Sequence, residues 1–300
     1  MLFFELVVVE TIGAFIGSSL SILGAILTFW FSRYVSLKIL PFKHYLTTLS
    51  FFDFLIGVIL FIPGRNLKHF CRIQPTFVCF IWSVPIGFSA MLSTMIYFNL
   101  AKGWSMKKLT KRILPPGVFI ITSVAISTSL VYYYYGEAGV HNTNWCWIGP
   151  EQWQLILVMY IPYWTFTAIC LAMGVALWRF FLKQKNQDIH TKWKARRWII
   201  FPICVFFTIF FTSYKRIRQV IDWRLDDLHW LDFLQGLMTP LVGFFDFILF
   251  YLLDPQIRNT CFKEMKSKAF DNDNLPLKSH LLLQEDDLMT RSSSEENLIL

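Results

Sequence analysis

The connector Asn144-Trp145-Cys146-Trp147-Ile148-Gly149 places two tryptophans around one cysteine in an otherwise polar stretch. Long apolar runs lie on both sides of it, at residues 113–135 and 153–178. We expect a loop that is anchored at one point and folded inward over a bundle built from such runs. The alternative interpretation is a belt of aromatic side chains at a membrane interface, with a free thiol.

The composition indicates a membrane protein. Hydrophobic residues make up 55% of the 300 residues and charged residues only 16%, whereas soluble domains carry about 25% charged residues. A helix needs about 20 apolar residues to cross a bilayer, and several runs are that long. Because a segment in lipid must satisfy its own backbone hydrogen bonds, these runs are expected to be helices. The first run lacks a basic start and is too long for a cleavable signal, so it is expected to stay as an anchor.

Seven runs are predicted to cross the bilayer, which gives an all-α membrane protein: a seven-transmembrane helix bundle with a disordered cytoplasmic tail. The transmembrane domain is predicted over residues 1–257 and the tail over residues 258–300. The tail shows no helical period and is acidic from residue 271 onward, as disordered segments often are. The predicted helices span about residues 8–31, 45–63, 73–101, 113–134, 153–181, 198–220 and 233–253.

The lysines and arginines predict the orientation of these helices. One set of loops, with the near part of the tail, carries nineteen of them, and the opposite set carries seven. Because cytoplasmic loops are enriched in Lys and Arg, we expect an extracellular N-terminus and a cytoplasmic C-terminus, which an odd number of crossings allows. The expected location is the plasma membrane. The net charge of +8 is then attributed to loops that face anionic lipid and a cytoplasmic partner, not to nucleic-acid binding.

The predicted spans offer no catalytic or metal-binding cluster. The six histidines fall in loops, in the tail or at span edges, and the cysteines form no CxxC pair. Residues 233–253 contain no lysine that could hold retinal, and no internal repeat typical of transporters is visible. We therefore expect no metal, no cofactor and no enzymatic activity.

Two acidic residues lie deep in the predicted spans, Asp53 in the second and Asp246 in the seventh. A carboxylate at that depth is costly and usually functional. The stretch Leu49-Ser50-Phe51-Phe52-Asp53 resembles the second-helix signature of G-protein-coupled receptors, and Gly243-Phe244-Phe245-Asp246 resembles the polar position of their seventh helix. The resemblance implies that the two acids approach each other and form an intramembrane polar switch, sharing a proton, a water or a sodium ion. Two separate neutral carboxyls are the alternative.

Further patterns narrow the resemblance to the cyclic-AMP-receptor-like (class E) group. Ser19-Leu20-Ser21-Ile22-Leu23-Gly24 is similar to that group's first-helix pattern, and the connector around Cys146 is similar to its Trp-Cys-Trp-Ile signature. In that group a cysteine at the start of the third helix bonds the loop cysteine, and a tyrosine follows near the inner end. The resemblance therefore implies a Cys71–Cys146 disulfide, with Tyr97 at the inner position and Cys79 as the alternative partner. It covers about residues 8–258.

Two departures from the wider receptor family are visible. The third predicted helix ends without an acid–arginine pair, as expected for class E, and Phe250 stands where a tyrosine is usual in the seventh. The resemblance implies a receptor that passes an extracellular signal to a heterotrimeric G protein. The expected G-protein-facing residues are Tyr97, Lys107, Lys108, Lys194, Arg196 and Arg197.

The ligand is expected on the extracellular side, where basic residues would focus anions. The resemblance suggests a cyclic nucleotide, and the charges favour a small anion or nucleotide, with Lys215 expected to point inward. Pairing with nearby aspartates, or snorkelling to the interface, is the alternative. The candidate ligand-binding residues are Lys215, Arg218, Trp145 and Trp147.

The tail carries two candidate modification sites. Ser292, Ser293 and Ser294 precede two glutamates, and phosphates added there would attract a basic partner such as an arrestin-like protein. Cys261 lies close enough to the seventh predicted helix for palmitoylation. The alternative to a receptor is a heptahelical membrane protein with a transport or scaffolding role and no G-protein coupling.

Overall fold

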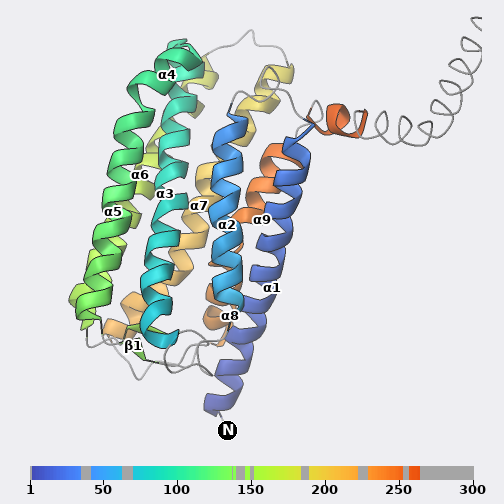
Figure 1. Cartoon of the computed structure of the whole chain (residues 1–300). Helices are drawn as coiled ribbons and strands as arrows, with labels where there is room; N and C mark the ends of the chain where they lie inside the picture. The colour runs from blue at the N-terminus through green and yellow to red at the C-terminus, as the bar shows by residue number, and fades with distance from the viewer. Residues whose placement is uncertain are drawn as a thin grey trace, which may run out of the picture.

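The protein is a multi-pass helical membrane protein. The computed structural model describes residues 2–34, 42–62, 70–136, 138–139, 146–148, 152–183, 189–221, 229–252 and 257–263. Six helices in this part are long and apolar enough to cross a membrane, and consecutive ones run in opposite directions (Figure 1). They are α1 (Leu2–Ser32), α2 (Lys43–Phe61), α3 (Phe70–Lys102), α5 (Leu114–Tyr135), α6 (Trp153–Lys183) and α7 (Ile189–Ile221).

The seventh predicted helix is interrupted, so the prediction of one continuous helix over residues 233–253 is wrong. The segment consists of α8 (His229–Met238), a turn at residues 239–241, α9 (Val242–Phe247) and η3, a π-helical turn (Ile248–Leu252). Pro240 explains the break, because proline has no N–H to donate and its ring clashes with the preceding turn. The Leu241 N–H instead reaches back only three residues, to the Met238 carbonyl at 3.2 Å.

The interrupted segment packs closely along α1. Glycines on one face of α1 make this possible: a Cβ atom at Gly13 would stand 2.6 Å from the Phe233 carbonyl oxygen, and one at Gly24 would stand 2.6 Å from the Gly243 carbonyl oxygen. Small residues at regular helical spacing allow backbones to approach in membranes. Because Gly13 faces α8 and Gly24 faces α9, the segment follows α1 across the break (Figure 1).

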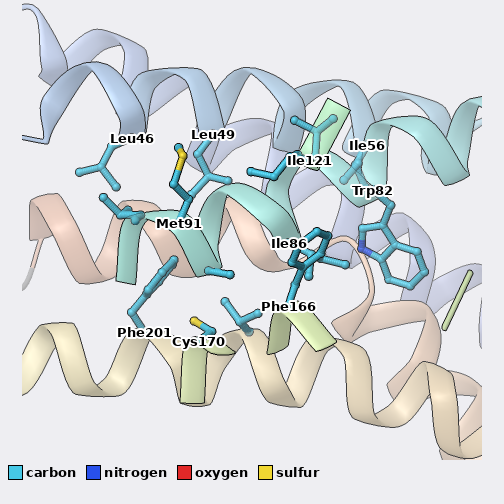
Figure 2. Close-up of a cluster of buried hydrophobic side chains, with 14 of the residues drawn as sticks. Leu46, Leu49, Ile56, Trp82, Ile86, Met91, Ile121, Phe166, Cys170 and Phe201 are labelled. Carbon is cyan, nitrogen blue, oxygen red and sulfur yellow. The ribbon is translucent and has the colours of Figure 1, made fainter. Parts of the chain in front are cut away.

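Helix α3 forms the centre of the bundle. In its most apolar part 78% of the residues are buried, compared with 22% for the peripheral α5. Figure 2 shows side chains of α3 between those of α2 on one side and those of α6 and α7 on the other. The labelled members of this core are Leu46, Leu49, Ile56, Trp82, Ile86, Met91, Ile121, Phe166, Cys170 and Phe201.

The two ends of the bundle differ. At one end, called here the lid end, α1 begins and two short strands pair antiparallel: β1 (Ala138–Gly139) and β2 (Trp147–Ile148). At the other, called the basic end, lies the short helix α4 (Met106–Arg112), whose first turn is capped by the Ser105 hydroxyl (Figure 1). Residues 257–263 form a further short helix. The connector that carries Cys146 therefore lies at the lid end.

Candidate functional site

The connector is attached to the bundle by a buried glutamine. Gln74 of α3 is fully buried and accepts a hydrogen bond from the Cys146 backbone N–H at 3.0 Å. Its amide nitrogen donates to the carbonyls of Ile59 and Ile62 at 3.3 and 3.2 Å. These two carbonyls lie at the end of α2, where helical partners run out. A single side chain thus links the end of α2, the start of α3 and the connector.

The described cysteines include one that is disulfide-bonded and several that are free thiols. Cys146 is buried and disulfide-bonded. Cys79, the alternative partner considered above, is a free thiol that donates to the Met159 sulfur at 3.5 Å. Cys170 and Cys204 are also free thiols. The side chain of Cys71 lies outside the described part, so the predicted Cys71–Cys146 pairing stays a prediction.

The two deep carboxyl groups come together in the interior. Asp53 of α2 and Asp246 of α9 are 1% and 2% exposed, and their side chains interact electrostatically. A Cβ atom at Gly243, one turn before Asp246, would stand 2.8 Å from the Asp53 Cβ, which shows how closely α9 approaches α2. Apart from the hydrogen-bonding interaction with Asp246, neither carboxyl oxygen of Asp53 has a hydrogen-bond partner within the described part. The pair therefore has unmet polar capacity of the kind that buried water satisfies.

A small cavity with several polar residues among its lining lies between the carboxyl pair and the lid end. It measures about 20 Å³ and is lined from α2, α3, α7, α8 and the turn after α8. Within the described part, the Trp82 indole N–H and the Gln235 carbonyl oxygen have no hydrogen-bond partner, although both side chains are buried. Thr212 and Thr239 share a hydrogen bond of 2.7 Å across the cavity. The lining residues are Leu60, Val78, Trp82, Thr212, Arg216, Gln235 and Thr239.

The basic residue on this cavity is Arg216, a residue that was not selected from the sequence. Lys215 is buried, as the inward prediction requires, but lines neither this cavity nor the groove described below. Arg218 is half-buried and also lines neither. Trp145 and the side chain of Trp147 lie outside the described part. Gln235 could have been noticed as the amide in an apolar predicted span.

At the basic end, two basic side chains lie against the ring of Trp104. The Lys108 ammonium lies 4.0 Å from the centre of the Trp104 ring, and the Arg112 guanidinium lies 6.0 Å from it. The Asn99 amide donates to the Trp104 carbonyl at 2.8 Å, which holds the backbone between α3 and α4. Lys107 is exposed at this end. Cation–π contacts thus orient part of the basic surface.

Other predicted residues are only partly placed. Tyr97 is half-buried and packs edge-on against Phe98 at 5.5 Å. Lys194, Arg196 and Arg197 belong to α7 by their backbone, but their side chains lie outside the described part, as do Ser292, Ser293 and Ser294. The Cys261 thiol is buried and donates to the Phe31 carbonyl at 3.8 Å. An acyl chain could be attached there only if the helix at residues 257–263 moved away from α1.

The described part contains no group of three or more His, Cys, Asp or Glu side chains arranged to hold a metal ion. No protein-family model matches the chain, and no curated protein matches it in sequence.

Proposed function

We propose that this protein is a G-protein-coupled receptor of the cyclic-AMP-receptor-like type, which receives a ligand at the lid end and acts on a heterotrimeric G protein at the basic end. The segment from α8 to η3 would supply the seventh crossing. It follows α1 from Gly13, which faces Phe233, to Gly24, which faces Gly243. The protein would have no catalytic activity.

The observation that carries the proposal is a line of buried polar groups through an apolar bundle. Arg216 and Gln235 lie toward the lid end and the pair Asp53–Asp246 lies deeper. Buried polar groups in a membrane are expensive, and they mark pathways along which a signal, an ion or a substrate acts. We infer that in this bundle they serve signalling.

The two helices that carry this line are irregular, which suits a conformational switch. Pro202 lies inside α7, and the neighbouring segment is broken after α8 and ends in a π-helical turn. The rings of Phe201 and Phe250 pack together at 5.2 Å between them. Proline and π-helical turns leave backbone groups that can be satisfied in more than one way. A ligand at Arg216 or Gln235 would therefore act on the two elements best able to rearrange.

The orientation follows from the basic residues. Exposed Lys107, Lys111 and Arg112 lie at the basic end, and an excess of Lys and Arg marks the cytoplasmic side. We propose that the lid end is extracellular and that the protein lies in the plasma membrane. Tyr97, Lys108, Lys194, Arg196 and Arg197 would complete the G-protein surface, and phosphorylated Ser292, Ser293 and Ser294 would recruit an arrestin-like protein.

The disulfide partner of Cys146 is proposed to be Cys71. Cys71 precedes Gln74 by three residues in α3, so the two share one helix face, and the Gln74 side chain contacts the Cys146 backbone. Cys79, Cys170 and Cys204 are free thiols, and the Cys261 thiol lies at Phe31. A disulfide on the extracellular side would suit the oxidising compartment.

The test is nucleotide exchange on purified Gα subunits by the protein in lipid nanodiscs. The variant Lys107→Gln/Lys111→Gln removes two exposed charges of α4, and Lys263→Gln removes one exposed charge from the short helix at residues 257–263. Exchange should fall with the first and not with the second, while both variants melt like the parent. Equal loss in both would mean that charge acts without a defined docking surface.

A transport or scaffolding role without a G protein is the second candidate. The break at Pro240 favours it, because interrupted helices line the substrate sites of many transporters. Solute flux into liposomes, with no exchange on any Gα class, would support it.

A further inference from the structure

A groove between α6 and α7 opens beside the small cavity. It measures about 350 Å³, which falls in the range of about 300–1,000 Å³ for small-molecule sites. Its outer walls consist of exposed apolar side chains, among them Leu157, Ile161 and Ile217, which are 45%, 61% and 55% exposed. On a membrane-spanning helix such side chains face lipid. The groove is lined by Trp153, Ile156, Leu157, Tyr160, Ile161, Trp164, Ser213, Arg216, Ile217 and Ile221.

The groove is lined mostly by apolar atoms, and three buried polar residues lie among its lining. Tyr160, Ser213 and Arg216 line it and are 6%, 2% and 4% exposed. The Ser213 hydroxyl is held in place by the Trp164 indole N–H at 3.0 Å. Apart from Arg216, which acts on it through its charge and a hydrogen bond, the Tyr160 hydroxyl has no hydrogen-bond partner within the described part. A cation and a hydroxyl thus line the same hydrocarbon-walled groove.

We propose that this groove binds a long-chain fatty acid that enters from the lipid bilayer. Its carboxylate would accept hydrogen bonds from the Arg216 guanidinium and the Tyr160 hydroxyl, and its chain would lie against Leu157, Ile161 and Ile217. A guanidinium carries five N–H donors, so Arg216 can serve neighbours within the protein and a carboxylate at once. Charge-assisted hydrogen bonds between arginine and carboxylate are among the strongest in proteins.

The depth and shape of the site select this class of ligand. Arg216 precedes the last residue of α7, Ile221, by five residues, which places it about 7–8 Å inside the helix end. That is near the boundary between hydrocarbon and headgroups, where the carboxylate of a membrane fatty acid lies. Because the Arg216 side chain is only 4% exposed in the groove, a small carboxylate reaches it more easily than a phospholipid headgroup. A freely soluble anion would gain nothing from the apolar walls.

Arg216 also connects the groove to the interior, because it lines the small cavity together with Gln235 and Trp82. A carboxylate in the groove would draw the Arg216 guanidinium away from the small cavity. This movement would change the polar surroundings of the Gln235 amide on α8. This regulatory step rests on the proposed receptor function, whereas binding of the fatty acid does not. An experiment can therefore refute the regulatory step without refuting fatty-acid binding.

The binding test uses the full chain in nanodiscs and a photoactivatable, alkyne-tagged stearate. We expect saturable labelling that maps to α6 and α7, competition by stearate, and no competition by methyl stearate or cyclic AMP. Arg216→Gln should weaken binding by about tenfold or more, and Arg33→Gln, at an exposed arginine of the basic end, should leave it unchanged. Leu157→Trp should also block the groove, whereas Ile126→Trp, at a position equally exposed on α5, should not.

Each outcome decides the proposal. Equal competition by the acid and its methyl ester, labelling outside α6 and α7, or unaltered binding in Leu157→Trp would overturn it. Stronger competition by phosphatidylglycerol than by stearate would assign the groove to a phospholipid and also overturn it. Specific stearate binding without nucleotide exchange would leave this site intact and refute the receptor function.

Discussion

Replacing Gln74 with leucine should loosen the connector from the bundle without removing a covalent bond. The substitution keeps the side chain's approximate size but removes three hydrogen bonds: two to the carbonyls of Ile59 and Ile62 and one from the Cys146 N–H. Because Cys146 is fully buried, its N–H would lose its partner where water cannot replace it. An unsatisfied buried donor costs about 1–3 kcal/mol, and each lost hydrogen bond costs about 1 kcal/mol.

The expected total is a loss of about 3–5 kcal/mol in the free energy of unfolding. At about 2–4 °C per kcal/mol for chains of 150–250 residues, this lowers the melting midpoint by roughly 6–20 °C. A thiol-reactive fluorogenic dye can follow the transition in nanodiscs, because the thiols of Cys79 and Cys170 are buried in the folded protein. The disulfide at Cys146 should also be reduced faster by a water-soluble phosphine.

The matched control is Thr48→Val. The Thr48 hydroxyl is exposed and bonds only within its own helix, to the His44 carbonyl at 3.0 Å, so the change should cost less than about 0.5 kcal/mol. Gln74→Glu keeps the acceptor for the Cys146 N–H and should melt between the parent and Gln74→Leu. If Gln74→Leu melts together with the control and its disulfide resists reduction, Gln74 does not hold the connector.

Three further changes test other contacts. Gly243→Ala places a Cβ atom 2.7 Å from a hydroxyl of α1 and 2.8 Å from a Cβ of α2, which should lower the free energy of unfolding by about 1–3 kcal/mol. Gly117→Ala should cost less, since its Cβ atom meets only a flexible methionine. An equal drop in melting midpoint for both variants would contradict the close packing at Gly243. Cys146→Ser should abolish surface expression or ligand response and Cys71→Ser should have the same effect; peptide mapping that finds another pair would refute the assignment. Asp53→Asn should change the ligand response more than the melting midpoint, and an unchanged dose–response curve would reduce the residue to a structural role.

The long apolar helices could be predicted well because bilayer thickness fixes their length. The run predicted over residues 153–181 is α6, Trp153–Lys183, and the run over residues 113–134 is α5, Leu114–Tyr135. The helices extend further where the sequence is polar: α7 begins at Ile189 rather than near residue 198. Hydropathy detects only the part of a helix that is apolar, whereas helical hydrogen bonding continues beyond it.

The break in the seventh predicted helix and the helix α4 were missed for related reasons. Proline is common inside membrane helices, and Pro75, Pro85, Pro162 and Pro202 do lie within continuous helices here. Pro240 alone therefore did not predict an interruption of the helix in its segment. Helix α4 has only seven residues and a basic composition, so it shows no apolar run, although Ser105 is a typical N-cap.

The site residues could not all be predicted, because they are brought together by tertiary contacts that the sequence alone does not reveal. The basic cluster near residue 215 was evident from the sequence. Adjacent side chains on a helix point about 100° apart. The choice of Arg216 over Lys215 therefore requires knowing how α7 is rotated about its own axis. That rotation is set by packing, for example of Pro202 against Gly174. Gln74 was visible as a polar residue in an apolar run, but its partner in the connector lies 72 residues away. The approach of Asp53 and Asp246 was expected only from the resemblance, and the close contact of α9 with α1 and α2 shows how the fold achieves it.

We propose that this bundle transmits a signal from its lid end to a G protein. The most direct measurement is GTP exchange on each Gα class by the purified, correctly folded protein in nanodiscs, with and without candidate ligands. We expect ligand-dependent exchange on at least one class, lost in Asp53→Asn and in Lys107→Gln/Lys111→Gln. Absence of exchange on every class, together with solute flux through the protein in liposomes, would contradict it.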